Sequence, residues 1–117
     1  DGLGVSEIKK LGIKQIIISS EKNSVVSTRA GKLDIPCLHG IDNKKDALMD
    51  YCTINDIDLA CVAYIGNDIN DKEALGIAGF TFCPADAHES IKVISDHVLN
   101  TKGGDGVIRE LLDLLKK

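Results

Sequence analysis

Short apolar runs, too brief to be helices, recur along this chain and constrain its fold more than any other feature. Ile16-Ile17-Ile18, residues 60–65 and residues 80–83 consist mainly of β-branched, aromatic and small apolar residues. Such runs are typical of strands buried on both faces. Segments whose apolar residues have helical spacing separate them. Strands that alternate with helices in this way predict an α/β fold with a mainly parallel sheet.

The remaining elements continue this alternation. Further short strands are expected over 35–39 and near 98–99, with a loop over 103–106. Helices are expected over 3–11, from the capping pair 23–24 to 33, from 42–43 to 51, from about Asp71, over 88–95 and over 107–117. A chain of 117 residues without an internal repeat or linker is expected to form one unit, 1–117.

Composition argues against several classes of partner. The 14 basic and 18 acidic residues give a net charge of −4, and aromatic residues make up only 3%. Neither favours nucleic-acid binding, which needs a basic surface or stacking platforms. The apolar runs are too short to span a bilayer, so no membrane partner is expected. The four cysteines contain no C-x-x-C pair, which favours reduced thiols in a cytoplasmic protein.

Polar side chains follow three of the expected strands, and in parallel sheets ligands bind outside the carboxyl ends of the strands. Hydroxyl groups and a lysine can hold a phosphate, and clustered oxygen atoms can hold Mg²⁺. The polar residues are Ser19 and Ser20 after the first strand, Asp42 and Lys44 after the second, and Asn67, Asp68 and Asp71 after residues 60–65. Their joint position favours a phosphate or anion site.

Each of these groups, taken alone, also has a structural interpretation. Ser19-Ser20 is compatible with a helix-entry turn, and Lys44 with a surface lysine. Gly66-Asn67-Asp68 has the composition of a turn, and Asp71 can cap a helix. In the same way Asp86 and His88 resemble a helix start, and Tyr51 and Tyr64 resemble core residues.

The order of these motifs resembles the haloacid dehalogenase superfamily over essentially the whole chain. Within it, the chain is similar to the small capless branch. That branch includes 3-deoxy-manno-octulosonate-phosphate phosphatases and the C-terminal domain of N-acylneuraminate cytidylyltransferases. The motifs are Ser19-Ser20, Lys44, Gly66-Asn67-Asp68-Ile69-Asn70-Asp71, Pro84-Ala85-Asp86-Ala87-His88 and Gly103-Gly104-Asp105-Gly106.

The resemblance implies a Rossmann-like three-layer fold, and a Mg²⁺-dependent phosphatase for a sugar-acid phosphate of the Kdo or nonulosonate type. It also implies a cytoplasmic homotetramer, fused to a cytidylyltransferase. By position, Ser19 and Ser20 would bind the phosphoryl oxygens. Lys44, or Lys45 beside it, would balance the charge of an aspartyl-phosphate. Asn67, Asp68 and Asp71 would bind the metal, and the tail at Gly103 and Gly104 would reach a neighbouring subunit.

The sequence departs from the family pattern in two places. The opening motif Asp-x-Asp-Gly is absent, and Asp1-Gly2-Leu3-Gly4 does not replace it. The first strand, a flap hairpin, the nucleophile and the general acid would be absent together with this motif. We therefore expect a partial domain with a central gap in its sheet. Asn67 stands where an Asp usually binds the metal, which would weaken binding unless Asp68 takes over.

These departures leave alternatives to an active phosphatase. One is a catalytically inactive oligomerisation or regulatory domain of the cytidylyltransferase. Another is a phosphoacceptor or nucleotide-binding module of similar architecture.

Overall fold

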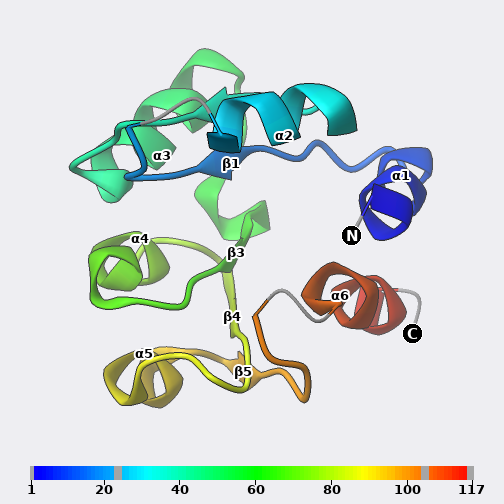
Figure 1. Cartoon of the computed structure of the whole chain (residues 1–117). Coiled ribbons are helices and arrows are strands. Elements are labelled where there is room, and N and C mark those ends of the chain that lie inside the picture. The colour runs from blue at the N-terminus through cyan, green and yellow to red at the C-terminus, as the bar shows by residue number, and fades with distance from the viewer. Residues whose placement is uncertain (1, 23–24, 104–105, 116–117) are drawn as a thin grey trace.

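A computed structural model describes residues 2–22, 25–103 and 106–115, in which helices alternate with strands (Figure 1). The helices are α1 (Gly2–Lys10), α2 (Val25–Leu33), α3 (Lys44–Ile54), α4 (Lys72–Leu75), α5 (Glu89–Ile94) and α6 (Val107–Leu115), with 3₁₀ turns η1 (Leu59–Cys61) and η2 (Ile69–Asp71). The strands are β1 (Ile17–Ile18), β2 (Cys37–Leu38), β3 (Ala63–Ile65), β4 (Phe80–Cys83) and β5 (His97–Val98). The predicted α/β order is confirmed.

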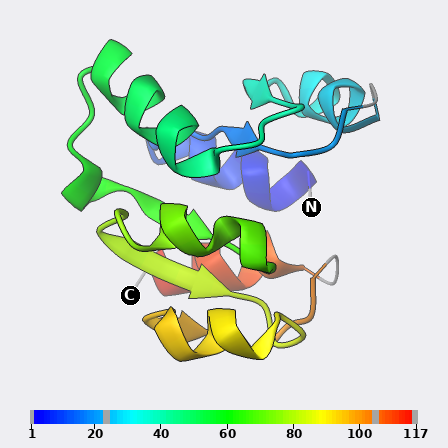
Figure 2. The ribbon, with the colours of Figure 1, turned by 90° about the vertical axis from the view of Figure 1, so that its left-hand side faces the viewer.

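All strand pairs are parallel, and helices cover both sides of the strands. β1 pairs with β2, with Ile17 opposite Cys37, and β3, β4 and β5 pair in that order. In Figure 1, α3, α4 and α5 lie on one side of the strands, and α1 and α6 lie on the other. Figure 2 gives the same arrangement from the side. The molecule therefore has the three layers of the predicted Rossmann-like fold.

Among the described residues the strands form two separate sheets, one of two strands and one of three. The amide groups of Ile17 and Ser19 donate toward β2, to Pro36 and Leu38, so those of Ile16 and Ile18 face away from it. On β3, Val62 accepts from Phe80 and Gly66 donates to Phe82, so Ala63 and Ile65 face away from β4. Among the described residues, β1 and β3 each thus have one edge without a strand partner, in addition to the outer edges of β2 and β5.

Burial agrees with open edges on β1 and β3. Both residues of β1 are only half-buried, and Ala63 is exposed. A strand in the middle of a parallel sheet with helices on both faces is normally buried throughout. The incomplete burial of β1 and of Ala63 therefore indicates a sheet that lacks a strand between β1 and β3.

The main core lies between the three-stranded sheet and the helices α3, α4 and α5. Its buried members are Leu48, Cys52, Tyr64, Ala74, Leu75, Cys83, Ala87 and Ile91, and Ile18 of β1 packs against it. A second cluster of Phe82, Leu99 and Leu111 joins β4 to α6. Since Ile18 belongs to the first sheet, side-chain packing connects the two sheets even though their backbones do not pair.

The structure differs from the sequence expectations at several boundaries. Residues 59–61 form a 3₁₀ turn rather than the start of the strand, because the Asp58 side chain caps the turn by accepting from the Ala60 amide at 2.9 Å. β1 has only two residues, Ile17 and Ile18, one fewer than the apolar run from Ile16 predicts. The expected cap at 23–24 lies outside the described residues. None of the helices seen in the described ranges is long and apolar enough to cross a membrane.

Gly79 is the glycine most constrained by packing, and it provides a test of this fold. A Cβ built at Gly79 would lie 2.0 Å from the carbonyl oxygen of Ala60, whereas one at Gly31 in α2 meets nothing within 4 Å. We expect Gly79→Ala to lower the free energy of unfolding by at least about 1–3 kcal/mol, because backbone atoms must move. Gly31→Ala should raise it by up to about 1 kcal/mol. Urea unfolding followed by circular dichroism measures both, and equal effects would contradict the packing of η1 against Gly79.

Candidate active site

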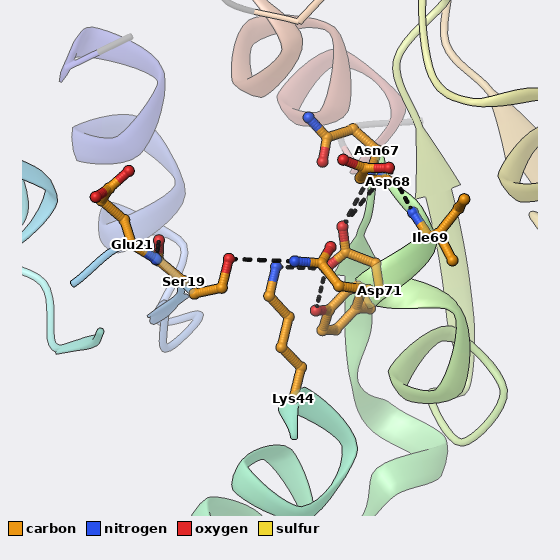
Figure 3. A network of polar contacts seen from close by, with 10 residues as sticks. Ser19, Glu21, Lys44, Asn67, Asp68, Ile69 and Asp71 are labelled. Atoms are coloured by element: carbon orange, nitrogen blue, oxygen red, sulfur yellow. Dashed lines mark hydrogen bonds and ion pairs between the residues drawn. The ribbon is translucent and has the colours of Figure 1, made fainter. Parts of the chain in front are cut away.

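The carboxylate of Asp71 is the centre of a buried polar network (Figure 3). Its Oδ1 accepts from the Lys44 ammonium at 2.9 Å and from the Tyr64 hydroxyl at 2.7 Å. Its Oδ2 accepts from the backbone amides of Asn67 at 3.0 Å and Asp68 at 3.3 Å. Asp71 is only 3% exposed, so these donors replace the water that an ionised carboxylate needs.

Local sequence explains why Asp71 turns inward. Asp68 begins η2 and accepts from the Ile69 amide at 2.7 Å, and the two aspartates form a capping box. Gly66 leaves room for the turn, since a Cβ there would lie 2.7 Å from the Cβ of Asp71. The Gly66–Asp71 segment is therefore a compact turn with one carboxylate inside and one outside.

Lys44 approaches this turn from the first residue of α3. Asn43 caps that helix by accepting from the Asp46 amide, and the Lys44 side chain, only 10% exposed, extends to Asp71. An ammonium group has three N–H donors. Asp71 uses one, and no acceptor for the other two lies within the part of the chain that the structure describes. A buried cation with unused donors favours a bound anion.

The serines after β1 lie on the other side of Lys44. Ser19 Oγ accepts from the Glu21 amide at 3.0 Å, and Ser20 Oγ accepts from Asn70 Nδ2 at 3.2 Å. The second bond joins the loop after β1 to η2, residues that are 50 positions apart in sequence. Ser19, Lys44 and Asp71 therefore lie near one another at the carboxyl edge of the strands (Figure 3), and the hydrogen bond to Asn70 places Ser20 there too. Their roles in binding stay predictions.

Asn67 and Asp68 lie at the exposed end of the same turn. The Asn67 carbonyl accepts from the His88 amide at 3.0 Å, which fixes the backbone while its carboxamide extends outward (Figure 3). Both oxygens of Asp71 accept from donors inside the protein, so of the three predicted metal ligands only Asn67 and Asp68 offer an open side chain to a cation. Residues 2–22, 25–103 and 106–115 contain no group of three or more His, Cys, Asp or Glu side chains placed to hold a metal.

The side-chain oxygens of Asn67 and Asp68 fit two positions in the coordination shell of a Mg²⁺ ion. Mg²⁺ is commonly bound by one or two carboxylates and keeps several water ligands. Asp68 supplies one carboxylate, and Asn67 supplies a neutral oxygen. The chemistry of the two side chains suits Mg²⁺, although the set carries a single negative charge.

The surroundings of Asp71 and Tyr64 shift the pKa values of these two groups in opposite directions. Burial alone would raise the pKa of Asp71, but hydrogen bonds from Lys44, Tyr64 and the Asn67 amide outweigh it, and the pKa lies below the ordinary 3.8. Burial, and then the hydrogen bond to Asp71, raise the pKa of the Tyr64 hydroxyl well above its ordinary value of 10.0. Tyr64 therefore stays a neutral donor, and Asp71 stays ionised at neutral pH.

Other residues singled out from the sequence lie outside this network. His88 caps α5, since its Nδ1 accepts from the Ser90 amide at 3.1 Å. Gly103 donates from its amide to Asp86 Oδ1 at 2.7 Å, and Gly104 lies outside the described residues. Two members of the site were not predicted. The sequence predicts only core packing for Tyr64, and it predicts no role for Asn70, although Asn70 lies within the Gly66–Asp71 motif.

The pKa of Asp71 leads to a prediction on pH dependence. Because the folded-state pKa lies below 3.8, the carboxylate stabilises the fold fully above about pH 5, and this stabilisation is lost as the pH falls through and below 3.8. We expect Asp71→Asn to lower the free energy of unfolding by about 3–5 kcal/mol at pH 7, since Lys44 loses its partner. The difference from the unmodified chain should shrink at pH 3, as measured by urea unfolding.

Asp34 provides the matched control for this measurement. It forms an ion pair with Lys9 at 2.8 Å, but both side chains are exposed. Asp34→Asn should change the free energy of unfolding far less than Asp71→Asn at pH 7, because exposed pairs are screened by solvent. An equal loss for both variants would contradict the buried network.

Comparison with known proteins agrees with this geometry. The sequence profile of the haloacid dehalogenase-like hydrolases matches residues 5–111. The chain is 32% identical to the 3-deoxy-D-manno-octulosonate 8-phosphate phosphatase of Haemophilus influenzae over 98% of its length, and 34% identical to that of Escherichia coli K12. It spans 64% and 62% of these two proteins, less than two thirds of each.

Solved structures show the same fold. The phosphatase of Moraxella catarrhalis, in complex with magnesium, phosphate and KDO, superposes with a TM-score of 0.93 at 34% identity, over 97% of this chain and 66% of that one. The cobalt-bound Haemophilus influenzae enzyme gives 0.92 at 31% identity, over 97% and 67%. The match of profile, sequence and structure over nearly the whole chain settles its family: it belongs to the haloacid dehalogenase-like hydrolases.

Proposed function

We propose that this chain carries the phosphate-binding part of a Mg²⁺-dependent phosphatase that acts on a sugar-acid phosphate. The supporting observation is the Lys44 ammonium, which is 90% buried as a side chain, held by Asp71 at 2.9 Å and left with two unused donors. The relatives support the substrate class, because they act on 3-deoxy-D-manno-octulosonate 8-phosphate. A sialic acid or other nonulosonate phosphate has the same chemistry and belongs to the same proposal.

Each residue of the site has a distinct task in this proposal. Lys44 neutralises the phosphoryl group, and Asp71 is a positioning residue that fixes the direction of the ammonium. The hydroxyls of Ser19 and Ser20 already accept hydrogen bonds, from the Glu21 amide and Asn70, so their own hydrogens are available to the phosphoryl oxygens. These donors are held in place before the ligand arrives, which is the condition for stabilising the charge that develops during phosphoryl transfer.

Asn67 and Asp68 are the residues that would hold Mg²⁺ beside this site. The ion would neutralise charge on the phosphoryl oxygens when bound. The chain's own contribution is to fix the turn that carries both side chains, through the Asn67 and Asp68 amides on Asp71.

The nucleophile is proposed to enter on a further strand. β1 and β3 each present an open edge, and their carboxyl ends lead to Ser19 and Gly66 at the site. A parallel strand between them would hydrogen-bond to Ile16 and Ile18 on one side and to Ala63 and Ile65 on the other. An Asp-x-Asp sequence at the carboxyl end of that strand would lie beside Lys44. One aspartate would attack phosphorus and break its bond to the sugar-acid oxygen, which the other aspartate would protonate. That second aspartate would then take a proton from a water molecule, which would hydrolyse the aspartyl-phosphate to inorganic phosphate.

A complementation experiment tests this function. A synthetic peptide with an apolar strand followed by Asp-x-Asp-Gly is added to the chain with Mg²⁺ and 3-deoxy-D-manno-octulosonate 8-phosphate. We expect the peptide to raise the melting temperature, because it completes the sheet, and to produce inorganic phosphate. Lys44→Met should abolish phosphate release in the same mixture.

The control peptide has the same strand with both aspartates replaced by asparagine. It should raise the melting temperature similarly and release no phosphate. A peptide that neither binds nor stabilises the chain would refute the strand position. Stabilisation without any turnover would instead favour a domain without catalytic activity.

A non-catalytic role is the second candidate, and one observation favours it. Of the two aspartates in the Gly66–Asp71 turn, only Asp68 remains open to a cation, because Asp71 is used internally. In this reading the domain promotes assembly of a cytidylyltransferase into a homotetramer, with the tail at Gly103 and Gly104 at the subunit contact. Loss of the tetramer on deleting residues 102–117, measured by light scattering, would support it.

Metal affinity provides a further test between the catalytic and the non-catalytic role. We expect Asn67→Asp to tighten Mg²⁺ binding at least about tenfold, because it adds a second carboxylate without altering the backbone amide that contacts Asp71. Isothermal titration calorimetry of both chains measures the change. The matched control is Asn70→Asp, which adds the same charge one turn away. An equal gain in the control would show a general charge effect and not a site at Asn67.

A further inference from the structure

A mostly apolar hollow lies at the amino edge of β1 and β2, at the end of the strands opposite the candidate active site. Residues 12–15 lead into β1 and residues 34–36 lead into β2, and because the two strands are parallel both segments meet there. Lys9 of α1 and Tyr51 of α3 complete the lining. The volume is about 380 Å³, which is in the range of small-molecule sites.

The hollow is separate from the residues that the proposed phosphatase uses. Tyr51 follows Lys44 by seven positions on α3, which places it about 10 Å further along the helix axis. The strand proposed between β1 and β3 would add on the side of β1 away from β2, so it does not account for a hollow that residues 34–36 line. No step of the proposed reaction needs this hollow.

Apolar side chains form most of the lining. Ile13 is 41% exposed, Ile35 and Tyr51 are half-buried, and Pro36 is exposed. Water that covers such side chains is released when a ligand takes its place, and this release favours binding of an apolar body. Tyr51 also offers an aromatic ring, against which a second ring can pack.

The charged side chains of the lining leave one positive charge unbalanced. Lys9 and Asp34 pair at 2.8 Å, and Gln15 is held in place because its Nε2 donates to the Val5 carbonyl at 2.9 Å. Lys14 is exposed and has no ion pair or side-chain hydrogen bond within the ranges that the structure describes. An ammonium group beside an apolar hollow is complementary to a ligand with an apolar body and one anionic group.

We propose that this hollow binds a small aromatic carboxylate, as a second site that is independent of the proposed phosphatase function. The Lys14 ammonium pairs with the carboxylate, and the ring of the ligand covers Ile13 and Ile35 and packs against Tyr51. Binding there joins α1, α3 and the starts of β1 and β2 through a single ligand.

Nuclear magnetic resonance titration of the ¹⁵N-labelled chain with 2-naphthoate tests this site. Inorganic phosphate is present at saturation, so that the probe does not occupy the phosphate position. We expect 2-naphthoate to shift the amide signals of Gly12, Lys14 and Ile35 and to leave those of Ser19 and Lys44 unchanged. Shifts confined to Ser19 and Lys44, or to another face of the molecule, would overturn the site.

Two pairs of variants separate charge from apolar contact. Lys14→Gln should weaken 2-naphthoate binding about two- to fivefold, as expected for an accessible ion pair, whereas Lys72→Gln, at an exposed lysine outside the hollow, should not. Ile13→Asp should weaken it at least about tenfold, because it removes apolar contact and adds a like charge. Ile54→Asp, at an 82% exposed isoleucine outside the hollow, should leave the affinity unchanged. An equal loss within either pair would contradict the proposed contacts.

Two further probes test the class of ligand. The neutral alcohol 2-naphthalenemethanol has the same rings without the charge, and it should bind with the same affinity to the unmodified chain and to Lys14→Gln. Octanoate has the charge without the rings, and it should bind more weakly than 2-naphthoate. Octanoate that binds as tightly would overturn the aromatic class, and a neutral probe that loses affinity with Lys14→Gln would overturn the ion pair.

Discussion

The rest of this structure depends on the buried carboxylate of Asp71. It accepts from Lys44 on α3, from Tyr64 on β3 and from two amides of its own turn, so one group ties together three segments. Breaking a buried pair of this kind costs about 3–5 kcal/mol, because the remaining charge has no water. The same bonds fix the Lys44 ammonium and the turn that carries Asn67 and Asp68. Stability and site geometry therefore originate from one network.

This network matters because the two sheets do not pair with each other. Ile18 of the β1–β2 sheet packs on the main core, Ser20 accepts from Asn70, and α3, which contacts β1, extends Lys44 to Asp71. Two of these connections are polar side-chain contacts located at the candidate site. A strand added between β1 and β3 would join the sheets through their backbones, and the side-chain contacts would then serve mainly to position ligand-binding groups.

The convergence of Ser19, Lys44 and Asp71 could be predicted, because each follows a strand and parallel strands bring their carboxyl ends to one edge. The internal role of Asp71 could not, since the sequence does not show which of two nearby aspartates faces inward. Burial of Asp71 depends on the space at Gly66 and on Tyr64, a residue whose sequence context indicated only core packing. Asn70 contacts a serine 50 residues away, and no local pattern encodes such a pair.

The arrangement also explains how metal binding and folding can vary independently in this chain. Asn67 contributes only its backbone amide to Asp71, and its carboxamide extends outward from the turn. A change between Asp and Asn at this position therefore alters the ligand offered to a cation while every bond to Asp71 is kept. The opposite holds at Asp71, whose oxygens have no capacity left for a metal, and where a substitution removes the support of Lys44. Loss of metal affinity can thus accumulate on the exposed end of the turn without unfolding the domain, so an intact fold is compatible with either the catalytic or the assembly role.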